Sequence, residues 1–303
     1  YETIAEPTTN SYVDTDIVPG TTYFYVVSAV NDIGEGPNSA QADATATVNL
    51  PATPSSLHSA AGDSEVRLYW TGAATANGYN VKRSLSSGGE YETIAEGVAE
   101  TEFHDTSVEN DITYYYRVSS VNGAGESSNS SAVSATPRTG MLVQVANQSA
   151  FQTAVNNAVA GDIIELADGN YSAFKIRRKY GTHSAPIVIK AANPLGAVFN
   201  AGQLELEFTR HIIVQGFRWT TSTSQKMRGT HYCRLTGNSF ELDETGLSSL
   251  VWISIGGADS HHNRVDHNDF KNKTALGNYV QLSGENGQVS QYDRIDHNYF
   301  FNL

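Results

Sequence analysis

Hydrophobic and polar positions follow different patterns in the two halves of the chain. Within residues 51–137, short segments alternate apolar and polar positions, as at 65–70 and 79–83, and glycine-containing turns at 61–63 and 87–89 separate them. A period of two residues, broken by frequent turns, is typical of strands that bury one face. This half of the chain therefore predicts a β-sandwich.

The sandwich pattern is repeated within the chain. Two segments recur at offsets of 90 and 91 residues: 1–6 as 91–96, and 22–31 as 113–122. We expect the C-terminal part of one module over 1–47 and a complete second module over 51–137.

The complete module resembles a fibronectin type III module. It carries Trp70 in an early strand, then Tyr114, Tyr116 and Val118, and a Val-Asn pair before a glycine-rich turn. The resemblance implies core packing for Trp70 and Tyr114. It also implies a spacer role, which is usual for such modules in bacterial polysaccharide-degrading enzymes.

Beyond residue 140 the pattern predicts one short helix and then many short strands. Ser149 and Gln152 fit a capping box, apolar residues follow at helical spacing, and Gly161 ends the segment. Such a helix can cover the open end of a solenoid. Apolar, β-rich runs follow at 163–166 and 211–217.

A 30-residue repeat completes the second half. Residues 233–240 recur as 263–270 and again as 293–300. A repeat of this length predicts stacked coils, and we expect a right-handed parallel β-helix over 141–303. The whole chain is therefore expected to be all-β, and to be truncated at both ends, inside a module and inside a coil.

Three columns of equivalent residues follow from this repeat. We expect an amide ladder made of Asn238, Asn268 and Asn298. We expect an aromatic stack in the core made of Phe240, Phe270 and Phe300. The third column consists of the arginines Arg234, Arg264 and Arg294. Stacked arginines repel one another unless carboxylates or a bound anion neutralise them. They form either a solvated face paired with nearby aspartates or an anion-binding surface.

Charge and composition restrict the partners. The net charge of −13 lies entirely in residues 1–140, with 5 Lys and Arg against 18 Asp and Glu. This acidic half argues against nucleic acid as a partner. No apolar run is long enough for a membrane span, and the lone Cys233 excludes an internal disulfide.

The second half resembles the chondroitinase B and alginate lyase family of β-helical polysaccharide lyases, from about Leu142 to the last residue. The resemblance rests on five segments that occur in the family's order: 168–171, 181–187, 211–217, 272–277 and 294–300. It implies a polysaccharide lyase, a carbon–oxygen lyase whose catalytic pair here is Lys273 and Arg294. It also implies a calcium site, for which the matching region offers Asn238, Asp266 and Asn268.

Residue chemistry qualifies that calcium site. Asp266 and Asn268 are expected to alternate onto one face of a strand. Because Asn268 stands where the family has an acidic residue, the ligand set carries one formal charge, which predicts at most weak Ca²⁺ binding.

The proposed reaction explains why cations are needed. β-Elimination removes the proton next to a uronate carboxylate, so negative charge develops on a group that is already anionic and a cation must stabilise it. The resemblance gives Lys273, expected to be exposed at a strand end, the role of base. It gives Arg294 the roles of binding the carboxylate and helping to protonate the leaving oxygen.

Further expectations concern the substrate and its location. Arg264, Lys271 and His297 are candidate substrate-binding residues. We expect an anionic uronate polysaccharide, with alginate preferred and dermatan or chondroitin sulfate second. We also expect a bacterial protein that is secreted or held at the cell surface, with its export signal upstream of this chain.

Two alternatives stay open. One is a pectate-lyase-like or polygalacturonase enzyme on the same scaffold, although the chain lacks the acidic cluster of the former and paired aspartates for the latter. The other is a non-catalytic glycan-binding or adhesion protein with sandwich spacers. Formation of unsaturated uronate products separates a lyase from both the hydrolase and the binding protein.

Overall fold

The computed structural model describes residues 1–18, 20–47, 49–257, 259–285 and 288–301. The predicted domain end at Leu303 lies outside these residues. Two compact units are present. One comprises Tyr1–Leu57, Tyr69–Phe103 and Tyr115–Val133, and the other His58–Leu68, His104–Tyr114 and Ser134–Leu303. No helix in the described ranges has the length and apolar character that a membrane span requires.

The N-terminal part is built from short strands. Pairs form between β1 (Thr22–Tyr25) and β4 (Ala42–Thr45), and between β2 (Val30–Asn31) and β3 (Gly34–Glu35). A five-stranded sheet follows, made of β7 (Gly78–Ser84), β8 (Glu92–Val98), β10 (Tyr114–Asn122), β11 (Gly125–Glu126) and β12 (Val133–Ala135). A three-stranded sheet contains β5 (Ser55–Ala61), β6 (Val66–Thr71) and β9 (Glu102–Asp105).

These sheets are those of the β-sandwich that the alternating segments predict. In β6, and in β10 as far as Val118, buried positions alternate with partly or fully exposed ones. Trp70, Tyr114, Tyr116 and Val118 are all buried. The predicted packing roles of Trp70 and Tyr114 are therefore confirmed.

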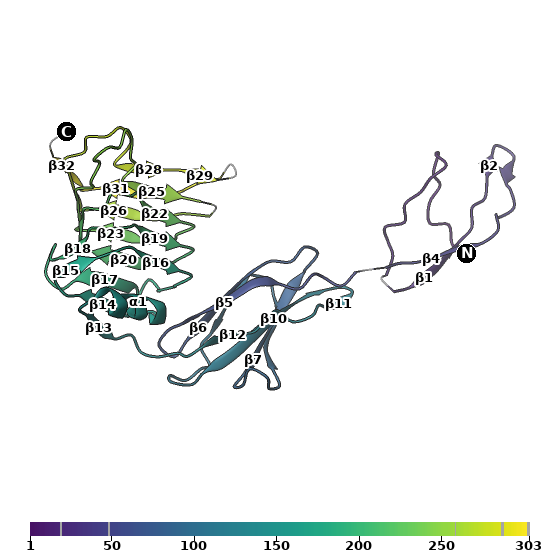
Figure 1. Cartoon of the computed structure of the whole chain (residues 1–303). Coiled ribbons are helices and arrows are strands. Elements are labelled where there is room, and N and C mark those ends of the chain that lie inside the picture. The colour runs from purple at the N-terminus through teal and green to yellow at the C-terminus, as the bar shows by residue number, and fades with distance from the viewer. Residues whose placement is uncertain (19, 48, 258, 286–287, 302–303) are drawn as a thin grey trace. The chain divides into compact units, whose positions relative to one another are not determined.

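The C-terminal part is a parallel β-helix whose coils visit three sheets in turn (Figure 1). The first sheet contains β13 (Leu142–Val145), β14 (Ile163–Leu166), β17 (Ile187–Ala191), β20 (Ile212–Gln215), β23 (Arg234–Thr236), β26 (Arg264–Asp266) and β31 (Arg294–Asp296). The second contains β15 (Gly169–Tyr171), β18 (Ala197–Phe199), β21 (Arg218–Trp219), β24 (Ser239–Phe240), β27 (Asp269–Lys271) and β32 (Tyr299–Phe301). The third contains β16 (Phe174–Arg177), β19 (Leu204–Glu207), β22 (Gln225–Arg228), β25 (Ile253–Gly256) and β28 (Val280–Leu282). An antiparallel pair, β29 (Gly284–Glu285) and β30 (Gln288–Val289), follows β28.

The 30-residue repeat sets the register of the coils. Arg234 pairs with Arg264, and Arg264 with Arg294, across parallel strands. Phe240 and Phe270 are buried inside the β-helix, and Phe300 on the last described coil is 42% exposed. The three rings stack with centroids 5.2 and 5.1 Å apart and nearly parallel planes. Both the arginine column and the aromatic stack are therefore confirmed.

A helix lies at the start of the β-helix, where the sequence predicts one. α1 (Gln148–Asn157) buries Phe151 and Val155 in the core of the coils. The predicted capping box is wrong, because Asn147 is the N-cap and its side chain accepts a hydrogen bond from the Ala150 N–H at 2.9 Å. Asn is as good an N-cap residue as Ser, so the spacing of Ser149 and Gln152 alone did not identify the residue that caps this helix.

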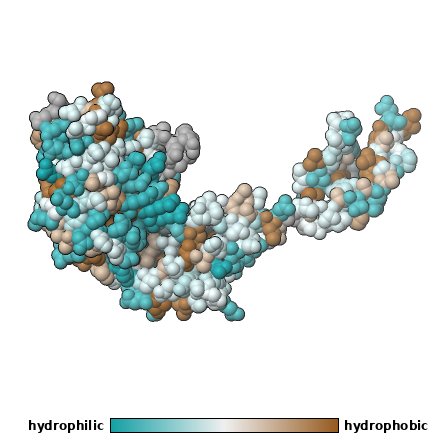
Figure 2. Space-filling view, in the orientation of Figure 1, coloured by the Kyte–Doolittle hydropathy of each residue, from teal (hydrophilic) through white to brown (hydrophobic). Residues whose placement is uncertain are grey.

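The outer face of the third sheet is hydrophilic, as Figure 2 shows around β16, β19 and β22. Lys175 forms ion pairs with Glu205 and Glu207 on the next coil. Opposite charges on neighbouring strands therefore cover this face, and stacking does not bring like charges together there.

Candidate active site

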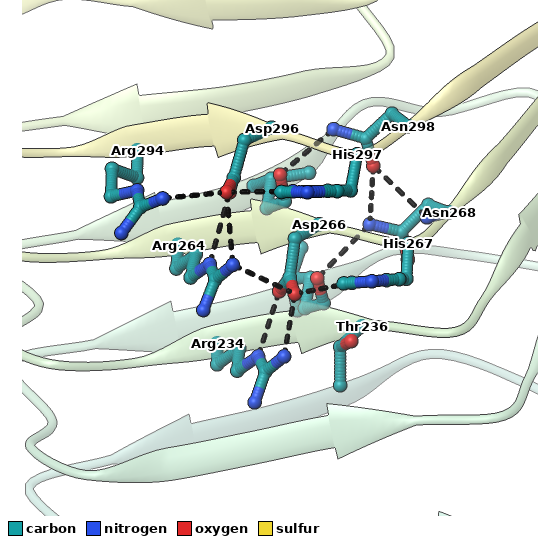
Figure 3. Close-up of polar contacts among 12 residues, drawn as sticks. Arg234, Thr236, Arg264, Asp266, His267, Asn268, Arg294, Asp296, His297 and Asn298 are labelled. Atoms are coloured by element: carbon teal, nitrogen blue, oxygen red, sulfur yellow. Dashed lines mark hydrogen bonds and ion pairs between the residues drawn. The ribbon is translucent and has the colours of Figure 1, made fainter.

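A column of charged residues runs across the outer face of the first sheet (Figure 3). Arg234 forms a two-pronged ion pair with Asp266 on the next coil, with an Nε–Oδ1 distance of 2.7 Å. Arg264 pairs in the same way with Asp296, with both distances at 2.9 Å. Each of these arginines thus reaches a carboxylate one coil further on, because the guanidinium fork matches the two carboxylate oxygens.

These ion pairs neutralise the stacked arginines and keep the aspartates ionised. The hydrogen bond from Arg264 holds the pKa of Asp296 well below its usual range. Burial alone would raise the pKa of Asp266, but the bonds from Arg234 and His267 lower it overall. The reading of this column as a charged face paired with aspartates is confirmed for Arg234 and Arg264.

Arg294 differs from the two arginines before it. Its side chain is 67% exposed, and one guanidinium nitrogen bonds Asp296 of its own strand at 2.9 Å. A guanidinium carries five N–H donors. Arg294 therefore keeps donors available for an anionic ligand.

Two histidines flank the column. His267 and His297 occupy left-handed turn positions at φ 55° and 54°, and their rings stack at 5.0 Å. Their Nδ1 atoms lie 2.7 and 2.9 Å from carboxylate oxygens of Asp266 and Asp296. Each carboxylate thus orients an imidazole whose Nε2 lies on the far side of the ring, and both side chains are more than half exposed.

The predicted amide ladder is present and is satisfied by hydrogen bonds along the stack. Asn268 Oδ1 accepts from the backbone N–H and the side-chain amide of Asn238, both at 3.0 Å. Asn298 Oδ1 accepts from the same two groups of Asn268 at 2.9 and 3.0 Å. The ladder therefore joins successive coils in their buried turns.

These contacts decide how the predicted calcium ligands fit an ion. The Oδ1 atoms of Asn238 and Asn268 accept hydrogen bonds from buried groups, the former from the Phe217 N–H at 3.0 Å. The Asp266 carboxylate is held by Arg234, Arg264 and His267. Because all three oxygen donors are already used and two cations flank the carboxylate, the residues in this arrangement do not fit Ca²⁺.

The expected shared face of these ligands is also wrong. β26 ends at Asp266, and the left-handed His267 turns the chain before Asn268. Asp266 consequently lies on the outer charged column, whereas Asn268 enters the amide ladder. Strict alternation does not extend across a left-handed residue.

Lys273 is buried, so the expectation of an exposed strand-end lysine is wrong. Its side chain is 5% exposed and lies between β27 and β28. Its Nζ donates to Glu244 Oε1 at 2.6 Å and to the Leu250 carbonyl at 2.8 Å. The Trp252 ring centroid lies 5.3 Å from Nζ, close enough for a cation–π interaction.

Glu244 organises the segment that carries Lys273. Its carboxylate also accepts from Trp252 Nε1 and from the Ala275 backbone N–H, both at 2.6 Å, and from the backbone and hydroxyl of Thr274. Burial alone would raise the pKa of Glu244, but the bonds from Lys273, Ala275 and Trp252 lower it to about 2. Glu244 is not among the predicted site residues, although its position 29 residues before Lys273 is close to the repeat length.

The structure distributes the predicted site residues over two sides of the coil. Arg264, Arg294 and His297 lie on the first sheet or at its end, whereas Lys271 lies in the second sheet and Lys273 directly follows it. Lys273 and Arg294 lie on successive coils, as their 21-residue spacing predicts. In the described part of the chain, neither a hydrogen bond nor an ion pair joins them. Lys271 is paired with Asp269 at 3.3 Å.

Comparison with known proteins adds to this picture. The family model described as chondroitinase B matches residues 145–302. A mannuronic acid specific polysaccharide family 6 lyase from the human gut microbiota is 22% identical, with 53% of this chain and 41% of that chain covered and a TM-score of 0.42.

The N-terminal half has relatives of its own. An amylopullulanase of Thermoanaerobacterium saccharolyticum is 40% identical over 81 residues, which are 27% of this chain and 6% of the relative. An Fn3-like protein from Clostridium thermocellum is 39% identical, with 30% of this chain and 97% of that chain covered and a TM-score of 0.28. The chain thus spans about 6% of the length of the first curated relative it matches.

These comparisons and the observed sheets agree with the predicted order of modules. The antiparallel sheets of the predicted β-sandwich come first, and a parallel β-helix follows them. Since the family model covers more than half of the residues, the chain belongs to the chondroitinase B family.

Proposed function

We propose that this protein is a polysaccharide lyase that cleaves a uronate-containing anionic polysaccharide by β-elimination. The observation that carries the proposal is the family match over 145–302, within which Lys273 and the exposed Arg294 occupy successive coils. A carboxylate substrate needs cationic partners, and the outer face of the first sheet offers the guanidinium of Arg294.

The proposed step balances without water. A base takes the C5 proton of the uronate, a C4–C5 double bond forms, and the C4–O bond breaks. The leaving oxygen takes up a proton. Arg294 binds the carboxylate and stabilises the charge that develops on it, and Arg264 and His297 contact the adjoining sugar units.

Lys273 is the proposed base, and its hydrogen bonds fix the position of its amine. A neutral amine has two N–H bonds and one lone pair. With its two N–H groups donated to Glu244 and Leu250, the lone pair of Nζ is directed away from both acceptors. Glu244 and the Leu250 carbonyl would thus hold the base in one orientation.

A second candidate for the base is His297, because Asp296 orients its ring through Nδ1. An imidazole held by a carboxylate is a common general-base arrangement. Lys273→Arg and His297→Ala separate the two. A Lys273 base predicts that Lys273→Arg is inactive while His297→Ala keeps measurable turnover; a His297 base predicts the opposite.

We propose alginate as the preferred polymer and dermatan or chondroitin sulfate as the second choice, by analogy with the family. The fibronectin type III modules would act as spacers in a bacterial protein that is secreted or held at the cell surface. We assign no step of the elimination reaction to a metal ion, since the residues that match the family's calcium ligands do not fit Ca²⁺ here.

A substrate panel tests this function. The purified protein is incubated with polymannuronate, polyguluronate and dermatan sulfate, and ultraviolet absorbance follows the conjugated double bond. We expect absorbance to rise on at least one polymer, most strongly on an alginate block. Binding without cleavage of any polymer would favour the glycan-binding alternative and contradict the proposed lyase.

A further inference from the structure

A cluster of metal-binding side chains lies at the turn that leads into the first sheet, apart from the arginine column. It consists of His231, Asp259 and His261, whose ligand atoms all lie within 4.8 Å of one another. His231 Nε2 is 3.3 Å from Asp259 Oδ2. Two imidazoles and one carboxylate form a donor set suited to a first-row transition ion.

The β-helix itself brings these groups together. His231 and His261 form a parallel β-bridge between successive coils, and their ring centroids are 4.0 Å apart. Asp259 precedes His261 by two residues, in a left-handed turn at φ 64°. The residues at 231 and 261 stack because of the same 30-residue repeat that stacks the arginines.

The surroundings prepare the ligands in two ways. His261 Nδ1 lies 2.9 Å from His262 Nδ1, and the tautomer in which His261 donates this hydrogen bond has a lone pair on Nε2 for an ion. The His231 side chain is only 9% exposed, so its ring is held in place within the coil. Neutral imidazole is the form that binds metals.

The charge balance also favours a cation bound with Asp259. Arg210 occupies the position of His231 on the preceding coil and repels a cation from that side. The Asp259 carboxylate lies 3.3 Å from His231 Nε2, and its side chain is 75% exposed, so it can move toward an ion. A site of two histidines without the carboxylate would lack this compensating charge.

We propose that His231, Asp259 and His261 bind one divalent transition-metal ion, with Zn²⁺ the best fit, and that the ion links two successive coils. Three protein ligands leave a fourth position of a tetrahedral Zn²⁺ open to water. This site shares no residue with the proposed catalytic site, so the metal proposal can be tested independently of the lyase activity.

Calorimetric titration of the chelator-treated protein with ZnCl₂ tests the proposal. We expect one ion per chain, and a melting temperature that rises with Zn²⁺ because the ion binds the folded state. His261→Ala and Asp259→Asn should each weaken binding at least tenfold. His183→Ala, which removes an exposed histidine outside the cluster, should leave the affinity unchanged.

A second readout reports direct ligation. Co²⁺ in place of Zn²⁺ should give visible absorption typical of a nitrogen- and oxygen-ligated ion, and His261→Ala should abolish it. Because His231 is buried, His231→Ala can fail to fold. The test therefore relies on the variants of Asp259 and His261, which are more exposed. The proposal would be overturned if the parent protein did not bind Zn²⁺, or if Asp259→Asn and His261→Ala bound it as tightly as the parent does.

Discussion

At the scale of single residues, Glu244 and Lys273 show that a sequence motif can identify a site residue without giving its contacts. The family resemblance identified Lys273 but implied nothing about its surroundings. The structure surrounds its amine with Glu244, the Leu250 carbonyl and the Trp252 ring. Since Glu244 belongs to an irregular segment one coil earlier, no local pattern could have predicted this contact.

Lys273→Met should remove the amine while the side chain keeps most of its packing contacts. The variant keeps an unbranched apolar chain in the buried site, and we expect kcat to fall ~10²- to 10⁴-fold, as is usual when a general base is lost. Lys273→Arg should be nearly as damaging, because a guanidinium stays protonated. Initial rates of absorbance increase measure both. A Lys273→Arg variant with activity near the parent's would mean that a fixed cation suffices at this position.

Glu244 should make the protein sensitive to acid. Its folded-state pKa of about 2 lies below the ordinary 4.5, so its stabilising contribution is present in full above pH 4.5 and is lost as the pH falls through about 2. The contribution is at most about 3 kcal/mol at neutral pH. Urea unfolding of the parent and of Glu244→Gln at several pH values measures it.

We expect the free energy of unfolding of the parent to fall more steeply than that of Glu244→Gln between pH 4.5 and pH 2. Glu165→Gln is a control, since that carboxylate is also paired but lies on the outer surface of the coils. Parallel pH profiles for the parent and Glu244→Gln would contradict the role given to this carboxylate.

At the scale of elements, the 30-residue repeat predicted the register of the last coils. Arginine, phenylalanine and asparagine columns align because equivalent residues occupy equivalent places in each coil. The repeat failed where the backbone departs from regular strands. His267, in a left-handed conformation, separates Asp266 from Asn268 and removes the shared face that alternation predicts.

The amide ladder should contribute measurably to stability. Asn268→Ala removes the acceptor of the buried Asn238 backbone N–H, and a buried donor left without a partner costs about 1–3 kcal/mol. The Asn238 side-chain amide keeps its bonds to the Val214 and Thr236 carbonyls. We expect a corresponding loss in the free energy of unfolding by urea. Asn200→Ala, at an exposed position, should change it by less than about 0.5 kcal/mol. Equal losses in the two variants would rule out a special role for the ladder.

At the scale of the whole molecule, composition and repeats predicted the order of the parts more reliably than the details of the site. The acidic first half and the neutral second half correspond to fibronectin type III modules and a β-helix. The site was harder to predict, because its residues come from two sheets and from the irregular segments between them. The cluster of His231, Asp259 and His261 was not predicted either, because Asp259 joins the two stacked histidines from a left-handed turn.

Calcium should have little influence on the whole protein. Arginines and buried amide donors already occupy the oxygens of Asn238, Asp266 and Asn268. We therefore expect millimolar Ca²⁺ to change the lyase rate by less than twofold. Complete loss of activity in a calcium chelator, with recovery at micromolar Ca²⁺, would show that the ligands rearrange around an ion.

The central claim is that the chain cleaves a uronate polymer by elimination. Mass spectrometry of the products formed in heavy-oxygen water tests this claim most directly. We predict oligosaccharides with one unsaturated terminal uronate, each lighter by one water than a hydrolysis product, and with no heavy oxygen incorporated during cleavage. Saturated products that carry the heavy isotope would contradict the account and assign the protein to the hydrolases.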